Sequence, residues 1–137
     1  MIERLVFDTE PLVAYLANEP GSDAVEGWID QVASGEIDGY ISPITKTELL
    51  YVGSRVGFRW EDLQASLSRL EALGVVVYDP GECWETAAEL KREHRMALGD
   101  AYALATAIAV DGTLLVGADD DFDAVGAAVE RFRSEPA

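Results

Sequence analysis

The stretch RLVFD at residues 4–8 sets the fold class expected of this chain. Its apolar part, Leu5 to Phe7, is unbroken, which is typical of a strand buried on both faces of a parallel sheet. After it, short apolar runs alternate with segments in which apolar residues recur at helical spacing. This alternation predicts an α/β fold in three layers, with helices on both faces of a central, mostly parallel sheet of four or five strands.

Turn and cap residues divide the rest of the chain into further elements. Strands are expected around residues 39–41, 75–78 and 114–116, with a weaker one at 128–132, and helices at 11–18, 22–34, 43–52, 60–73, 83–94 and 100–108. Ser22 and Ser42 are suited to cap their helices, and Gly35 and Gly74 to end theirs. Because no repeat, linker or low-complexity tract intervenes, residues 1–137 are predicted to form one domain.

The charge of the chain is strongly negative. Its 137 residues include 26 acidic and 10 basic ones, for a net charge of −16, and only two lysines. An acidic, lysine-poor surface is typical of a protein from a salt-rich cytoplasm, where a short Debye length screens self-repulsion; the alternative is an acidic protein that pairs with a basic partner. Either way, loose charge-driven binding of nucleic acid is disfavoured.

The cysteine content and the lengths of the apolar runs indicate the cellular compartment of the protein. Cys83 is the single cysteine, so an intrachain disulfide and a cysteine-based metal site are excluded. No apolar run approaches the ~20 residues of a membrane span, and the N-terminus opens directly into a strand-like run instead of a signal peptide. We therefore expect a cytoplasmic protein without a membrane partner.

Four acidic residues are expected near one edge of the sheet. Asp8 ends the first strand, and Asp119 follows the strand at 114–116. Ligands bind beyond the carboxyl ends of the strands in such sheets. Glu48 lies inside an otherwise apolar helix, at 43–52. Asp100 is the first residue of the alanine-rich helix expected at 100–108. Since a buried carboxylate is costly unless it is compensated, and a divalent cation accepts several hard oxygens, the pattern favours a metal site.

Each acid also has a simpler interpretation when it is taken alone. Asp8 could cap the next helix, and Asp100 could be an N-terminal helix acid stabilised by the helix dipole. Glu48 could be half exposed, and residues 119–123 could form a solvated loop. The joint placement of all four acids is harder to explain as coincidence.

These residues resemble the PIN-domain ribonuclease family, and within it the VapC-type toxins of toxin–antitoxin pairs. Four segments carry the resemblance in the family's order, over nearly the whole chain: Phe7–Thr9, Ser42–Leu49, Gly99–Ala107 and Leu114–Phe122. Each motif is weakly specific alone, whereas four in order with family-like separations are fairly specific.

The resemblance implies a metal-dependent endoribonuclease that is the toxin of a type II toxin–antitoxin system, with an antitoxin protein as partner and a homodimeric state. Asp8 and Asp100 are then the principal ligands of Mg²⁺ or Mn²⁺, and Glu48 and Asp119 complete the catalytic set; Asp121 and Glu10 are candidate outer-shell residues. Trp28, Phe58 and Trp60 are candidates for an apolar dimer interface.

The chain departs from the family at two positions of these motifs. Glu10 stands where the family often has serine or another small polar residue, and Gly117 replaces the usual threonine or serine. Glu10 could add a ligand or cap its helix, and the hydroxyl missing at position 117 could loosen the hydrogen bonding of the acids.

Basic residues that precede Asp100 are the best candidates for holding an RNA backbone: Lys91, Arg92 and Arg95. Their alternative role is to complement the dipole at the end of a helix. Arg55, Arg59 and Trp60 form a weaker candidate. The single histidine, His94, is expected to be a half-buried structural residue.

Other functions fit less well. A calcium loop starting at residue 119 lacks the glycine that its sharp turn needs, and a phospho-receiver centred on Asp79 lacks a suitably placed lysine. The alternatives that stay open are a PIN-like module that binds a partner and cleaves nothing, and a housekeeping PIN nuclease of RNA processing. The target RNA cannot be read from the sequence.

Overall fold

The computed structural model describes residues 1–79, 81, 83–118, 122 and 128–134 of the chain. Its centre is a five-stranded sheet in the order β3-β2-β1-β4-β5, and every strand pair is parallel. The strands are β1 (Arg4–Phe7), β2 (Asp38–Ile41), β3 (Val76–Val77), β4 (Thr113–Val116) and β5 (Val129–Arg131). The predicted parallel sheet is confirmed, and β1 lies at its centre, where both faces are covered.

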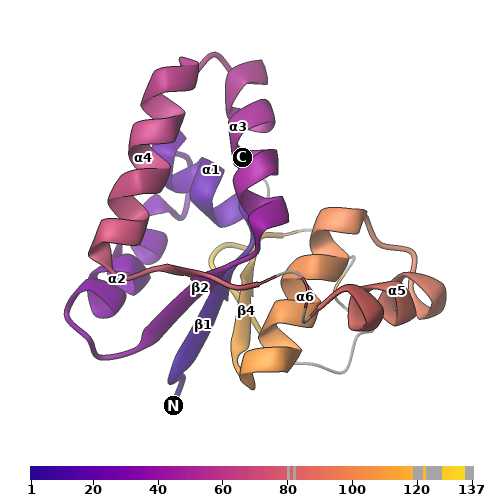
Figure 1. The fold of residues 1–137 in the computed structure, drawn as a ribbon. Coiled ribbons are helices and arrows are strands. Elements are labelled where there is room, and N and C mark those ends of the chain that lie inside the picture. The colour runs from indigo at the N-terminus through magenta and orange to yellow at the C-terminus, as the bar shows by residue number, and fades with distance from the viewer. Residues whose placement is uncertain (80, 82, 119–121, 123–127, 135–137) are drawn as a thin grey trace.

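In the described part of the chain, six helices connect the strands and cover both faces of the sheet: α1 (Thr9–Ala17), α2 (Ser22–Ala33), α3 (Pro43–Arg55), α4 (Trp60–Leu73), α5 (Trp84–Glu93) and α6 (Leu98–Val110). In Figure 1 the helices α1 to α4 gather on one side of the sheet, and α5 and α6 on the other. The three-layer α/β/α architecture predicted from the alternation of strands and helices is therefore confirmed.

The alternation of side chains along the central strands explains the two separate cores. Leu5 and Phe7 of β1 belong to the cluster that packs under α1 to α4, whereas Val6 between them belongs to the cluster under α5 and α6. In the same way, Leu115 of β4 joins the first cluster and Leu114 the second. Successive strand residues point to opposite faces, so an unbroken apolar run fills both cores at once.

Two local expectations need correction. The strand expected at 75–78 is only Val76–Val77, because β3 is an edge strand with a single neighbour and Val76 is 52% exposed. Ser22 is the first residue of α2 instead of its cap; Gly21 takes the cap position with φ +91°, and the Ser22 hydroxyl donates to Asn18. His94 is the extended residue that ends α5, half-buried as expected.

The cap expected at the start of the third helix is confirmed. The backbone N–H of Ile44 donates a 3.1 Å hydrogen bond to the Ser42 hydroxyl, and Pro43 occupies the first turn. This cap fixes the start of α3 directly after the carboxyl end of β2, and α3 packs against α1, α4 and α6. Among the described residues, no helix has both the length and the apolar character needed to cross a membrane.

Candidate active site

Asp8 lies at the centre of the candidate site because it follows the central strand directly. It is 5% exposed, and its backbone N–H donates to the Leu115 carbonyl, which ties it to the neighbouring strand β4. Asp8 takes the cap position of α1 with extended backbone angles, but its side chain makes no capping hydrogen bond. The helix-cap interpretation of Asp8 is therefore not supported by the structure, and another explanation is needed for a carboxylate at this place.

Asp8 shares one cavity with two of the other acids predicted as catalytic. The cavity has a volume of about 280 Å³, and its lining includes Asp8, Glu48 from α3 and Asp100 from α6. Three elements that are far apart in the sequence thus meet at the carboxyl end of β1, which is where parallel α/β sheets place their ligands.

Glu48 is held in place by two neighbours. The Thr9 hydroxyl donates a 2.8 Å hydrogen bond to Glu48 Oε1. Gly99, at the start of α6, lies so close to the same carboxylate that a Cβ atom at position 99 would overlap it. The absence of a side chain at position 99 therefore gives the Glu48 carboxylate its place next to Asp100.

The electrostatics of the cavity disfavour an ionised Asp8. Burial raises the pKa of Asp8 well above its ordinary value of 3.8, and the charges of Asp100, Glu48 and Glu10 raise it further. A hydrogen bond from the Thr9 backbone N–H lowers the pKa but does not reverse the shift. Asp8 Oδ1 is buried and has no hydrogen-bond partner among the described residues. A buried oxygen without a donor is destabilising, so Asp8 is suited to a cation.

The donor chemistry of the cavity fits a divalent metal ion, although the acids are not gathered as a complete site. Within the described part of the chain, no three His, Cys, Asp or Glu side chains are arranged to hold one metal ion. Asp119 and Asp121, the remaining predicted acids, lie outside the described residues. The fit rests on hard carboxylate oxygens around one cavity and on the unpartnered Oδ1 of Asp8.

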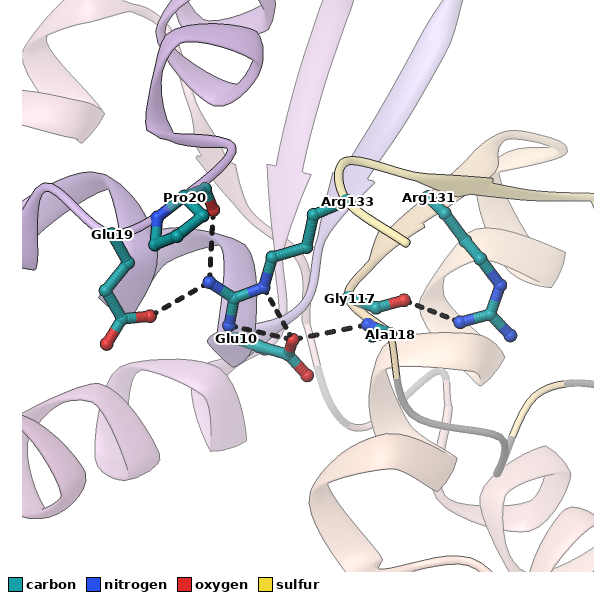
Figure 2. A network of polar contacts seen from close by, with 7 residues as sticks. All are labelled: Glu10, Glu19, Pro20, Gly117, Ala118, Arg131 and Arg133. Atoms are coloured by element: carbon teal, nitrogen blue, oxygen red, sulfur yellow. Dashed lines mark hydrogen bonds and ion pairs between the residues drawn. The ribbon is translucent and has the colours of Figure 1, made fainter. Parts of the chain in front are cut away.

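Glu10 also lines this cavity, and its carboxylate binds an arginine that is more than one hundred residues away in the sequence. Arg133 donates to Glu10 Oε2 from Nε (3.3 Å) and Nη2 (3.1 Å), and the Ala118 N–H donates to the same oxygen. Arg133 Nη1 also donates to Glu19, which lines the cavity too. Figure 2 shows Glu10 between Arg133 and the Gly117–Ala118 peptide.

Sequence reasoning missed several residues that shape this site: Thr9, Glu19, Gly99 and Arg133. The glycine before Asp100 was visible in the sequence, and so was the threonine after Asp8. Nothing in the local pattern around Arg133 indicated that it would contact residues more than one hundred positions earlier, because that contact depends on where β5 ends in space.

The basic residues proposed for RNA binding lie elsewhere. Lys91 and Arg92 are in the last turn of α5, and Arg95 follows this helix; all three are exposed. The Lys91 ammonium donates a 2.8 Å hydrogen bond to the Met96 carbonyl in the connection between α5 and α6. None of the three belongs to the described residues that line the acidic cavity.

The fold and the site together define a class of protein: a three-layer α/β domain with a carboxylate-lined cavity at the carboxyl edge of a parallel sheet. A model of the PIN domain family matches residues 5–128, which is most of the chain. The chain therefore belongs to the PIN domain family, whose members are nucleases. No curated protein sequence matches it with significant similarity.

Solved structures share this fold at low sequence identity. A toxin–antitoxin complex from Klebsiella pneumoniae matches with a TM-score of 0.69 and 23% identity, over 92% of this chain and 96% of the other. VapBC2 from Rickettsia felis, bound to a DNA fragment from its promoter, matches with a TM-score of 0.72 and 19% identity, over 93% and 98%. VapBC-1 from nontypeable Haemophilus influenzae matches with a TM-score of 0.69 and 16% identity, over 94% and 98%.

Proposed function

We propose that this chain is a metal-dependent endoribonuclease that hydrolyses RNA phosphodiester bonds, and that it acts as one domain over residues 1–137. The observation that carries the proposal is the state of Asp8. Its carboxylate is buried next to Asp100 and Glu48, and one of its oxygens has no donor among the described residues. A protein retains such an arrangement at a stability cost, and perturbed carboxylates in a cleft are typical of functional sites.

Asp8 and Asp100 are the proposed principal ligands of Mg²⁺ or Mn²⁺, with Glu48 and Asp119 completing the set. A bound divalent cation would supply activation of water and neutralise the charge that develops on the phosphate. Thr9 and Gly99 orient Glu48, which is well placed to accept a proton or to bind the ion from the α3 side. Asp121 is a candidate outer-shell residue on sequence grounds alone.

The RNA backbone is the proposed ligand of Lys91, Arg92 and Arg95. Their support is that they are exposed cations on a molecule of net charge −16, at the start of the connection that leads into α6 and Asp100. Because the overall charge repels nucleic acid, binding must depend on such local contacts and on the metal.

A role as the toxin of a type II toxin–antitoxin system is proposed from the structural neighbours. These neighbours are toxin–antitoxin and VapBC assemblies, and the matches cover nearly the whole of both chains. An antitoxin protein is then the expected partner, in the cytoplasm. A homodimer is proposed on the same ground, with Trp60, which is 49% exposed, as one apolar contact.

The central experiment measures cleavage of a mixed RNA substrate by the purified chain with Mn²⁺, Mg²⁺ or EDTA, at ionic strengths from about 0.1 to 1 M. We expect cleavage that requires the metal and that Asp8→Asn abolishes. Asp38→Asn is the matched control, because Asp38 is an exposed acid at the opposite edge of the sheet. A folded wild type that cleaves no RNA with either metal would favour a non-catalytic PIN module instead.

A further inference from the structure

Among the described residues, five carboxylates line the acidic cavity, and they fall into two groups. Asp8, Glu48 and Asp100 are the acids proposed to meet the cation. The other two are Glu10, in the first turn of α1, and Glu19, in the turn between α1 and α2. Both members of the second group accept hydrogen bonds from one guanidinium, that of Arg133. Arg133 therefore binds two of the acids that line this cavity, Glu10 and Glu19, and neutralises part of their charge.

The position of Glu10 depends on the chain that follows β4. Its Oε2 atom accepts from two Arg133 nitrogens and from the Ala118 N–H at 3.3 Å. A Cβ atom at position 117 would overlap this same oxygen, so the Glu10 carboxylate occupies the space that a side chain at position 117 would fill. The two residues that depart from the family pattern, Glu10 and Gly117, are therefore linked sterically: the glycine leaves the space that the Glu10 carboxylate fills.

Arg133 is itself fixed by packing. Its side chain is 9% exposed, and Nη1 donates to Glu19 Oε1 and to the Pro20 carbonyl, each at 3.1 Å. The neighbouring Phe132 is buried against Gly21, where an added Cβ atom would lie 2.7 Å from Phe132 Cδ2. A buried guanidinium with several carboxylate and carbonyl acceptors is held in one geometry.

We propose that Arg133 is a positioning residue that keeps Glu10 out of the metal site. By holding the Glu10 carboxylate against the Gly117–Ala118 peptide, it reserves the cation for Asp8, Glu48 and Asp100. Figure 2 shows this arrangement, in which Arg131 Nη1 donates a hydrogen bond to the carbonyl of Gly117 in the same peptide. The inference rests on the proposed metal-dependent function, since it concerns which acids the cation meets.

The test measures Mn²⁺ affinity of the metal-free chain by calorimetry. Arg133→Met removes one positive charge and frees Glu10, so we expect Mn²⁺ to bind roughly tenfold more tightly. Adding Glu10→Gln to this variant should return the affinity to about the wild-type value. A merely structural role for Arg133 predicts the opposite sign, because a loosened site binds metal more weakly.

The control variant is Arg4→Met, which removes the same charge at the opposite end of β1 and should leave the affinity unchanged. Unchanged or weaker Mn²⁺ binding by folded Arg133→Met would overturn this inference while leaving the proposed function intact. Wild type that binds no Mn²⁺ would overturn both together.

A second measurement covers the case in which Arg133→Met does not fold. Gly117→Ala should lower the melting temperature of the metal-free chain, because its Cβ atom displaces the Glu10 carboxylate from Arg133 and Ala118. The same substitution in a Glu10→Ser background should cost much less. Equal losses in both backgrounds would overturn the coupling of Glu10 to Gly117, and with it the proposed role of Arg133.

Discussion

The Thr9 hydroxyl donates a hydrogen bond of 2.8 Å to Glu48 Oε1, which ties the first turn of α1 to the middle of α3. The two residues are thirty-nine positions apart, and they belong to the helices that follow two neighbouring strands, β1 and β2. Since Thr9 follows Asp8 directly, this contact fixes the distance between two of the proposed metal ligands. The hydroxyl is therefore expected to matter for activity more than for folding.

Thr9→Val keeps the shape of the side chain and removes the donor. We expect RNA cleavage to fall by about 10–100-fold, as for other outer-shell partners of metal ligands, and the free energy of unfolding to fall by only about 0.5–1.5 kcal/mol. Thr47→Val is the matched control, because the exposed Thr47 hydroxyl only donates back to the Pro43 carbonyl of its own helix. Equal activity of the two variants would show that Thr9 does not orient Glu48.

Gly99→Ala tests whether activity depends on the position of the Glu48 carboxylate next to Gly99. An added Cβ atom would overlap that carboxylate, so Glu48 must move and cleavage should fall by at least about tenfold, the usual effect of a displaced catalytic group. In Gly27→Ala, the added Cβ atom of another helical glycine meets nothing within 4 Å, and we expect stability to rise by about 0.4–1 kcal/mol. Full activity in Gly99→Ala would exclude Glu48 from the mechanism.

Asp8→Asn should stabilise the metal-free chain. The pKa of folded Asp8 is raised above 3.8, so the folded state retains a proton that the unfolded state releases as the pH rises. Stability is therefore lost with increasing pH between 3.8 and the raised folded-state pKa. The Asp8→Asn variant does not lose this stability, because the asparagine amide does not ionise. At neutral pH in EDTA we expect the variant to melt about 2–8 °C higher, the shift that corresponds to about 1 kcal/mol.

The same melting experiment, repeated with Mn²⁺, distinguishes the effect of burying the Asp8 carboxylate from its effect on metal binding. Mn²⁺ should raise the melting temperature of wild type more than that of Asp8→Asn, because binding to the folded state adds to its stability. Asp38→Asn should behave as wild type under both conditions. A wild type that is more stable than Asp8→Asn in EDTA, at every pH above 4, would contradict the raised pKa.

Leu115→Ala tests the core that supports the site. Leu115 is fully buried and pairs with Phe7 in the sheet register, directly before Asp8, so its truncation should lower the free energy of unfolding by about 2–5 kcal/mol. Ile108→Ala on α6 removes a similar side chain that is 49% exposed and should change stability by about 0.5 kcal/mol or less. Chemical denaturation of both variants measures the difference, and similar losses would contradict the assigned core.

The sequence by itself determined the order and type of the elements, because the period of apolar residues is a local property. The run Leu5–Phe7 predicted a strand buried on both faces, and Ser42 with Pro43 predicted the start of α3, both as the structure has them. The placement of Asp8 followed from the end of its strand, since parallel strands end at one edge of a sheet. Asp100 was predicted on other grounds, as an acid at the start of an apolar helix. Even β5 was expected from its residues, although β3 proved shorter because an edge strand has one partner only.

Only the tertiary structure decided the partners of the acids. The sequence placed Glu10 and Gly117 as two unrelated departures from a family pattern, whereas the fold brings the carboxylate of one into the space left by the other. It also brings Arg133, which follows β5, to Glu10 in the first turn of α1 and to Glu19 in the turn between α1 and α2. Such contacts join segments more than one hundred residues apart, and they depend on strand order and on the path of the chain after β5, which no local period encodes.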